Sequence, residues 1–134
     1  MWSDQEIGFW KEYLQAHHGL DGELERLDGE FDLNIAVRVD GRLDAVLKVM
    51  RVGCGSGLVG MQVEALDHLA ATMPDLPVPR VIRRHDGAAA AAVTDLSGDE
   101  RIAWVISAID GLPLGAMRPH PAALVHEIGH TLGR

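Results

Sequence analysis

The sequence is short of basic residues and of cysteine. Its 134 residues include 12 Lys or Arg against 20 Asp or Glu, a formal net charge of −8, and lysine occurs only at Lys11 and Lys48. This acidic balance argues against binding to nucleic acid or to an anionic membrane surface, since both need a basic face. The one cysteine, Cys54, has no second cysteine with which to form an internal disulfide or a Cys-x-x-Cys zinc site. We therefore expect a reducing, cytoplasmic location.

Long hydrophobic runs are also missing. No stretch of about 18 apolar residues is present that could cross a bilayer, and the first residues lack the basic and apolar regions of a signal peptide. A soluble protein without a membrane partner is predicted. The length favours one compact domain with a real core and is too short for two full domains.

Hydrophobic periodicity predicts an α+β domain. A first helix is expected from residue 3 or 4 to residue 18, with Ser3 as its N-cap and Gly19 as its stop. Asp40-Gly41 is a strong signal for a tight hairpin. Strands are expected at 24–27, 33–39, 43–51, 80–84, 88–94 and 101–109, and a last helix lies within 119–134. A second helix, from residue 58 to about 73, is expected to bury Leu58, Met61, Ala65, Leu66 and Leu69.

Lys48 is conspicuous because it lies in the middle of residues 45–50, the most apolar strand expected in the first half of the chain. Burying an ammonium group costs free energy unless an anion pairs with it. A lysine at such a position either extends along the sheet into solvent or meets a fixed anion. The local sequence leaves both interpretations open.

Two glycine-containing segments have the character of anion-binding loops. Residues 29–34 form a turn that could lay backbone N–H groups over phosphates, or that could be an ordinary hairpin turn. Residues 53–57 contain three glycines, but they lack the Gly-Lys-Ser/Thr of a Walker loop and the last glycine of a dinucleotide fingerprint. This second segment is interpreted as a flexible connector.

His126, Glu127 and His130 match the His-Glu-x-x-His pattern of zinc proteases. That chemistry needs both imidazoles on a cleft and a third ligand. Helical periodicity places the two histidines opposite the apolar side of the expected last helix. A chance match on an exposed face is favoured, and a zinc metallohydrolase that uses these residues is kept as the alternative.

Taken in order, the segments resemble the N-terminal lobe of the aminoglycoside phosphotransferase and choline kinase-like family, which are small-molecule relatives of protein kinases. The resemblance is carried by residues 27–34, 45–49, 61–69, 76–81, 104–107 and 110–114. It implies a kinase-like N-lobe, an antiparallel sheet of five or six strands with one packed helix, an N-terminal helix and a C-terminal helix after the hinge. The implied parts are an N-terminal helix at 1–19, the N-lobe at 20–109, and at 110–134 the hinge with the first helix of a missing C-lobe.

The resemblance also implies a site for ATP and Mg²⁺. Lys48 would contact the α- and β-phosphates, and Gln62 would stand where many family members have a glutamate that pairs with this lysine. Glutamine can donate a hydrogen bond or accept one, but it cannot neutralise the ammonium group. The implied nucleotide-binding residues are Gly29, Glu30, Asp32 and Asn34 over the phosphates, Lys48, Gln62, and Ser107, Ala108 and Ile109 beside the adenine.

The chain is expected to be catalytically incomplete. Family members use a second-lobe loop with a base Asp and a metal-binding Asn, whereas the single asparagine here, Asn34, precedes Lys48. The function implied is the nucleotide-binding half of an ATP-dependent phosphotransferase. Its acceptor would be a hydroxyl compound such as an amino alcohol, a hydroxy amino acid or an aminoglycoside, and no catalytic residue lies in this chain.

Two further expectations concern partners. The partners implied are a nucleotide and the missing C-lobe or remainder of the parent protein, and a non-catalytic kinase-like interaction module is a second alternative. Leu124, Ile128 and Leu132 form an apolar face with no complete core to enter, so self-association is predicted.

Overall fold

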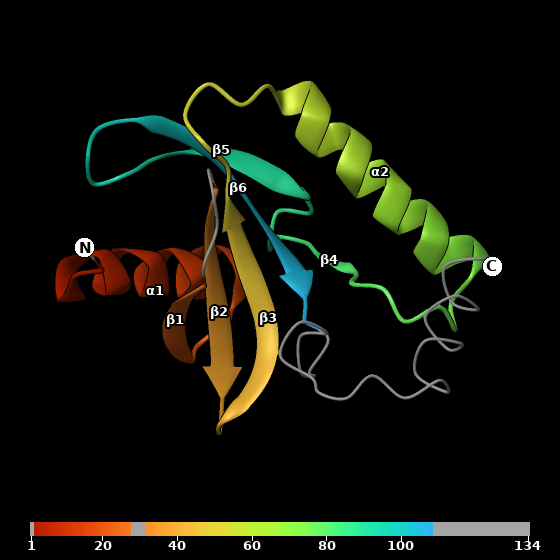
Figure 1. Cartoon of the computed structure of the whole chain (residues 1–134), viewed down its shortest axis with the longest axis horizontal. Coiled ribbons are helices and arrows are strands. Elements are labelled where there is room, and N and C mark those ends of the chain that lie inside the picture. Colours follow the sequence, from red (N-terminus) through yellow and green to blue (C-terminus); the bar gives the residue numbers. More distant parts are fainter. Residues whose placement is uncertain (1, 28–31, 109–134) are drawn as a thin grey trace, which may run out of the picture.

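The computed structural model describes residues 2–27 and 32–108, and within them the elements follow the predicted order. Figure 1 shows the two helices and six strands of this part of the chain. The elements are α1 (Asp4–His18), β1 (Glu23–Leu27), β2 (Leu33–Val39), β3 (Arg42–Val49), α2 (Ser56–Thr72), β4 (Val81–Ile82), β5 (Ala90–Thr94) and β6 (Glu100–Ser107).

Helix α1 begins and ends where the sequence predicts. The Ser3 hydroxyl accepts a hydrogen bond from the Glu6 N–H at 3.2 Å, which satisfies one of the free donors of the first turn. At the other end Gly19 adopts the left-handed conformation with φ 67°, and its N–H bonds back to the last turn. Both predicted caps are confirmed.

The strands form one antiparallel sheet in the order β1-β2-β3-β6-β4, and β5 also pairs with β6. Asp40 and Gly41 join β2 to β3 with φ angles of 53° and 77°, the pair of positive values that a type I′ hairpin requires. Strand β6 pairs with β3 along one edge and with both β4 and β5 along the other. The sheet therefore depends on β6 to join its first half to its second.

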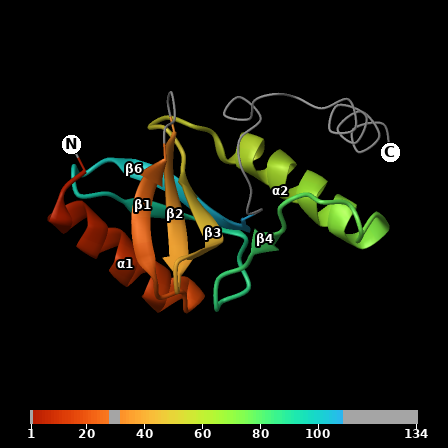
Figure 2. The same cartoon turned by 60° about the horizontal axis from the view of Figure 1, so that its bottom comes forward.

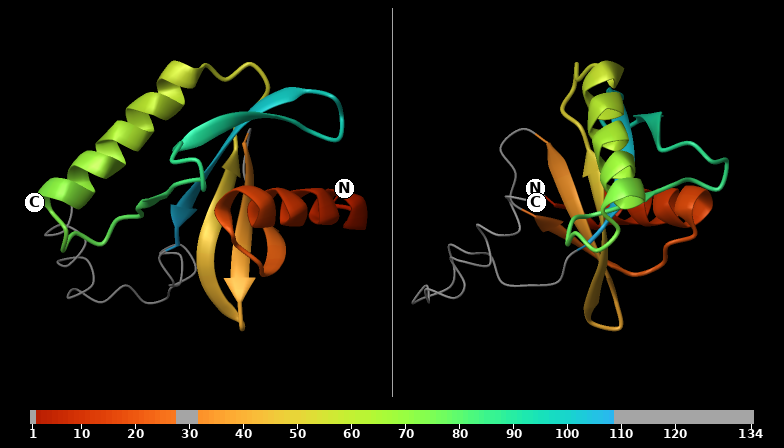
Figure 3. Two further views of the ribbon diagram at one scale, coloured as in Figure 1. Left: turned by 180° about the vertical axis from the view of Figure 1, so that it is seen from behind. Right: turned by 90° about the vertical axis from the view of Figure 1, so that its right-hand side faces the viewer.

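The two helices cover opposite faces of the sheet. Helix α1 crosses the back of β1, β2 and β3, as the front and rear views show (Figures 1 and 3), and Trp10, Tyr13 and Leu14 of α1 join the core cluster that contains Leu47 and Val105. Helix α2 runs diagonally on the side of β4 and β5 (Figure 2). It packs through Val59 and Val63 against Met50 and Trp104. Helix α1 therefore contributes directly to the main core of the sheet.

The buried face of α2 differs from the expected one. Val59 and Val63 are the buried residues of this helix, with Leu66 packed beside them, whereas Leu58 and Met61 are 37% and 61% exposed. Positions 59, 63 and 66 form their own helical stripe. The prediction for Leu58, Met61 and Ala65 was wrong because α2 carries apolar residues on more than one side, so periodicity alone does not select the stripe.

The bounds of four elements also differ from the expectation. Strand β4 contains only Val81 and Ile82, and the chain then enters a turn in which the Arg84 N–H donates to Ala88 O at 2.9 Å. Helix α2 begins at Ser56, so the glycine-rich connector 53–57 is partly helical. Strand β3 stops at Val49, and β6 stops at Ser107. The expected last helix at 119–134 lies outside the described residues.

The described part of the chain is thus an α+β fold with a six-stranded antiparallel sheet and two helices, as predicted. This arrangement is compatible with the N-lobe of a kinase-like fold. Neither helix has the length and apolar character that crossing a bilayer requires.

Candidate functional site

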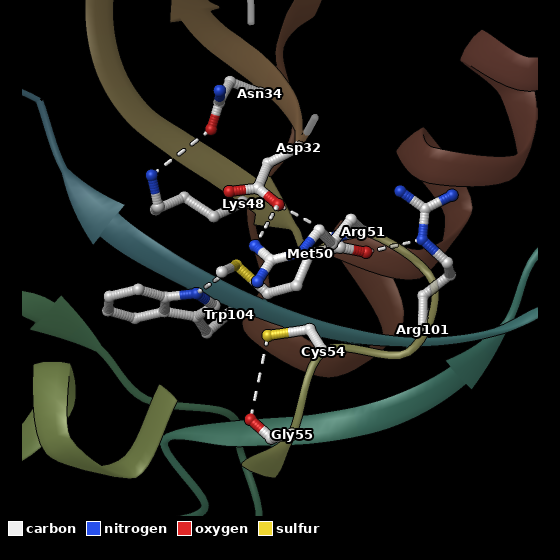
Figure 4. A network of polar contacts seen from close by, with 9 residues as sticks. All are labelled: Asp32, Asn34, Lys48, Met50, Arg51, Cys54, Gly55, Arg101 and Trp104. Carbon is white, nitrogen blue, oxygen red and sulfur yellow. Dashed lines mark hydrogen bonds and ion pairs between the residues drawn. The ribbon is translucent and has the colours of Figure 1, made fainter. Parts of the chain in front are cut away.

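The candidate site is built on a row of residues that runs across the sheet. Asn34 of β2 pairs in register with Lys48 of β3, and Lys48 pairs with Trp104 of β6. Side chains of directly paired residues stand on the same face, so these three form one surface. Figure 4 shows this surface and the polar contacts around it.

Lys48 lies on the face of the sheet that α2 occupies. Its neighbours in the strand, Leu47 and Val49, are fully buried and point to the α1 face. Lys48 itself is half-buried, and its Nζ donates a hydrogen bond to Asn34 Oδ1 at 3.3 Å. The same nitrogen lies 6.0 Å from the centre of the Trp104 ring, within cation–π range.

The charge of Lys48 has no counter-ion in residues 2–27 and 32–108. The ion pairs of this part of the chain are made by five arginines, and none involves Lys48. A neutral amide and an aromatic face attract a cation without neutralising it. The arrangement therefore presents a partly desolvated positive charge that is oriented by Asn34 and can accept an anion.

Asp32 lies close to this row (Figure 4), but its contacts stabilise the fold and do not reach Lys48. Its Oδ1 accepts a hydrogen bond from the backbone N–H of Arg51 at 2.9 Å and lies 4.0 Å from the Arg51 guanidinium. These contacts tie the start of β2 to the chain that leaves β3. Asp32 thus holds the segment after β3 against the start of β2. Its position in the sequence did not indicate this structural role.

The chain beyond β3 is held by contacts that the sequence did not reveal. The Met50 N–H donates to Ile102 O at 2.9 Å, and the Met50 carbonyl accepts from Arg101 Nε. The buried indole of Trp104 donates through Nε1 to Met50 Sδ at 3.3 Å. Arg101 is in turn paired with Asp95 at 3.2 Å, with both side chains largely buried. Trp104 is therefore locked in place beside Lys48.

Ser107 and Ala108 lie where β6 ends, at the end of the sheet opposite the start of β2. The Ser107 hydroxyl accepts from the Arg80 N–H at 2.8 Å, and Ser107 N–H donates to Arg80 O at 2.7 Å. Ala108 N–H donates to Asp44 O at 3.3 Å. The end of β6 is thus fastened both to the segment before β4 and to the beginning of β3.

Of the remaining candidates, Gln62 alone lies in the described part of the chain. Gln62 is half-buried on α2, and in the described part of the chain no hydrogen bond connects it with Lys48, whose amide partner is Asn34 instead. Gly29, Glu30 and Ile109 lie outside the described residues, as do His126, Glu127 and His130 of the alternative zinc site. Within the described ranges no group of three or more His, Cys, Asp or Glu side chains is placed to hold a metal ion.

A polar hollow of about 480 Å³ opens near the site but not at it. Ser3 and Glu6 at the start of α1 line it together with Asp32, Asp95 and Arg101. Two of its acidic residues are already engaged, because Asp32 bonds to Arg51 and Asp95 pairs with Arg101. The hollow does not include Lys48, so the two features are separate.

Comparison of the sequence with models of protein families and with curated proteins gave no match.

Proposed function

We propose that this chain is the nucleotide-binding half of an ATP-dependent phosphotransferase that acts on a small hydroxyl compound. The observation that carries the proposal is the half-buried ammonium of Lys48, which has a neutral amide partner and no carboxylate partner in the described ranges. A phosphate oxygen would supply the missing negative charge through a charge-assisted hydrogen bond.

The surface around Lys48 is long enough and apolar enough to bind a nucleoside. Val46 and Ile106 form the next row of the same face, and both are half-buried apolar side chains. From Trp104 to the end of β6 at Ser107 is about 10 Å at the rise of a strand. A nucleotide whose phosphates meet Lys48 would therefore lay its base against Val46 and Ile106, with its polar edge near Ser107 and Ala108.

Asn34 supports the same assignment. Its hydrogen bond holds the lysine side chain on the β2 side of β3. Within residues 2–27 and 32–108, no group of three or more His, Cys, Asp or Glu side chains is placed to bind Mg²⁺. The metal would reach this site with the nucleotide, and the groups that complete its coordination would belong to the part of the enzyme that binds the acceptor.

Titration of the chain with MgATP, followed by calorimetry, tests the proposal. Lys48→Met should weaken binding at least tenfold, because a hydrogen bond to a charged group contributes about 1.5–3 kcal/mol. Adenosine, which has no phosphate, should bind equally to both proteins. Lys11→Met removes the only other lysine, an exposed residue of α1, and serves as the matched control.

The result that would contradict the proposal is equally specific. If the wild-type chain binds no MgATP, or if Lys48→Met binds it as tightly as Lys11→Met, Lys48 is not a phosphate ligand. Circular dichroism of the three proteins would establish that each variant keeps its fold.

A further inference from the structure

The C-terminal end of α1 meets the turn between β4 and β5 through a cluster of titratable side chains. Arg84 is at its centre, with a side chain only 12% exposed. Its Nη1 donates to the Tyr13 hydroxyl at 2.9 Å, and its Nη2 lies 3.1 Å from His17 Nδ1. The backbone adds a third contact, since His85 N–H donates to His17 O at 2.8 Å. We call this cluster of Tyr13, His17, His18, Arg84, His85 and Asp86 the α1 latch.

The contact between Arg84 and His17 holds only when the imidazole is neutral. A guanidinium is always protonated and has donors but no acceptor. His17 Nδ1 must therefore be the acceptor, with its ring proton on Nε2. Protonation of His17 would turn Nδ1 into a donor that faces another donor and would place two positive charges in contact.

His18 is the second group that must stay neutral. It is 8% exposed, and in the described part of the chain neither ring nitrogen has a hydrogen-bond partner. Burial lowers the pKa of His18 below its usual 6.5, and the positive charge of Arg84 lowers it further. His17 and His85 act in the same direction, while the nearby backbone of Arg83 partly opposes them without reaching hydrogen-bond geometry.

Within the described residues no carboxylate offsets a proton on His18, and the one carboxylate of the α1 latch, Asp86, lies near His17 and is already engaged by Arg84. Asp86 is the carboxylate that faces the cluster, and its Oδ2 accepts from Arg84 Nε at 3.3 Å. The Ala88 N–H holds the pKa of Asp86 below its usual value, so Asp86 is already charged at neutral pH. Burial raises the pKa of Tyr13, which keeps its hydroxyl neutral. Acidification therefore adds only positive charge here.

The end of α1 and the 83–88 turn also pack too closely for a histidine ring to move between them. A Cβ atom on Gly19 would lie 2.8 Å from His85 Nε2, so the His85 ring lies directly against the end of α1. A shift of the 83–88 turn away from α1 is the simplest way to hydrate the histidines.

From these contacts we propose that the α1 latch is a pH-sensitive switch, which holds the end of α1 on the 83–88 turn while the buried His18 ring is neutral and releases it when His18 takes up a proton. The pKa of His18 is lower in the folded chain than in the unfolded chain. Its contribution to stability is therefore complete above about pH 6.5 and is lost as the pH falls through the lowered value. The proposal is independent of nucleotide binding.

Hydrogen exchange of the whole chain between pH 7.5 and pH 5, corrected for intrinsic rates, tests the switch. The amides of Gly19 and Leu20, which bond to Gln15 O and Leu14 O, report on the end of α1. Their opening should increase by about tenfold for each unit by which the pKa of His18 lies below 6.5. Amides in the middle of β3 should not change.

Two variants separate titration from general loosening. Replacing both histidines, His17→Gln with His18→Leu, should abolish the pH dependence, whereas His68→Gln on the exposed side of α2 should leave it unchanged. If the double variant fails to fold, proton NMR of the wild-type histidines decides the question, because the His18 ring should titrate below 6.5. A His18 that titrates at or above 6.5, an opening that does not depend on pH, or an equal effect of His68→Gln would overturn the proposal.

Discussion

Asp32 offers a sharp test of whether a residue of the candidate site is structural. The structure gives it one hydrogen bond from Arg51 N–H at 2.9 Å and a weak ion pair at 4.0 Å, with the Asp32 side chain 26% exposed. At this exposure the hydrogen bond should be near the low end of the range for a charged acceptor, about 1.5 kcal/mol. The ion pair is between exposed groups and should contribute close to nothing.

The two substitutions at Asp32 should therefore differ. Asp32→Ala removes the acceptor and should lower the free energy of unfolding by about 1.5 kcal/mol. Asp32→Asn keeps a neutral acceptor for Arg51 N–H and should lower it by about 0.5 kcal/mol. With a urea m-value of about 1.5 kcal/mol/M, the midpoints should fall by about 1 M and 0.3 M.

Unfolding in urea can be followed by tryptophan fluorescence, since Trp10 and Trp104 are 3% and 1% exposed in the folded chain. Asp75→Ala, an exposed residue in the loop after α2, is the matched control and should not move the midpoint. If Asp32→Asn were as damaging as Asp32→Ala, the charge and not the hydrogen bond would be the stabilising feature, and the structural interpretation would be refuted. MgATP affinity should not fall in Asp32→Asn, since this carboxylate is engaged by Arg51.

Two further predictions concern glycines and turnover. Gly22→Ala would bring a Cβ atom to 2.5 Å from Arg38 O, so it should destabilise the β1–β2 pairing by about 1–3 kcal/mol. Gly60→Ala, on the open surface of α2, should instead stabilise the chain by about 0.5–1 kcal/mol. Urea titrations of the two variants should shift in opposite directions, and a neutral Gly22→Ala would contradict the packing argument. Incubation of the chain with MgATP and a panel of amino alcohols and hydroxy amino acids should give no phosphorylated product, because the proposed function assigns the catalytic groups to another lobe. Measurable product would contradict that assignment.

Features set by nearby residues could be predicted from the sequence. Ser3 and Gly19 end α1 through contacts within one turn, and Asp40-Gly41 forms its hairpin because these residues tolerate positive φ. Such chemistry is local, so no knowledge of the tertiary fold is needed. The order of the elements followed from the same signals.

The surroundings of Lys48 could be predicted only in part. Its position in an apolar strand marked it as unusual, but its contact with Asn34 depends on the β2–β3 register, and its contact with Trp104 depends on the pairing of β3 with β6. A register between distant strands is set by the whole sheet. The contribution of Trp104 to the site was missed for this reason.

The α1 latch was also missed, because its members come from distant parts of the chain. His17 and His18 form no metal-ligand spacing, and nothing near them in sequence indicates that Arg84 is their neighbour. The useful signal would have been the two adjacent histidines in the last turn of a helix whose apolar face is strongly marked.

The central place of β6 has a consequence for the order of events in folding. Strands β1, β2 and β3 are joined by short connections and can pair as soon as they are synthesised, but the free edge of β3 finds its partner only in residues 100–107. Strands β4 and β5 also need this segment as their pairing partner. Contacts between distant segments form slowly, because a long loop must close first. Until β6 arrives, the growing chain exposes an apolar strand edge around Lys48, so the interval between β3 and β6 is when aggregation or chaperone binding should occur.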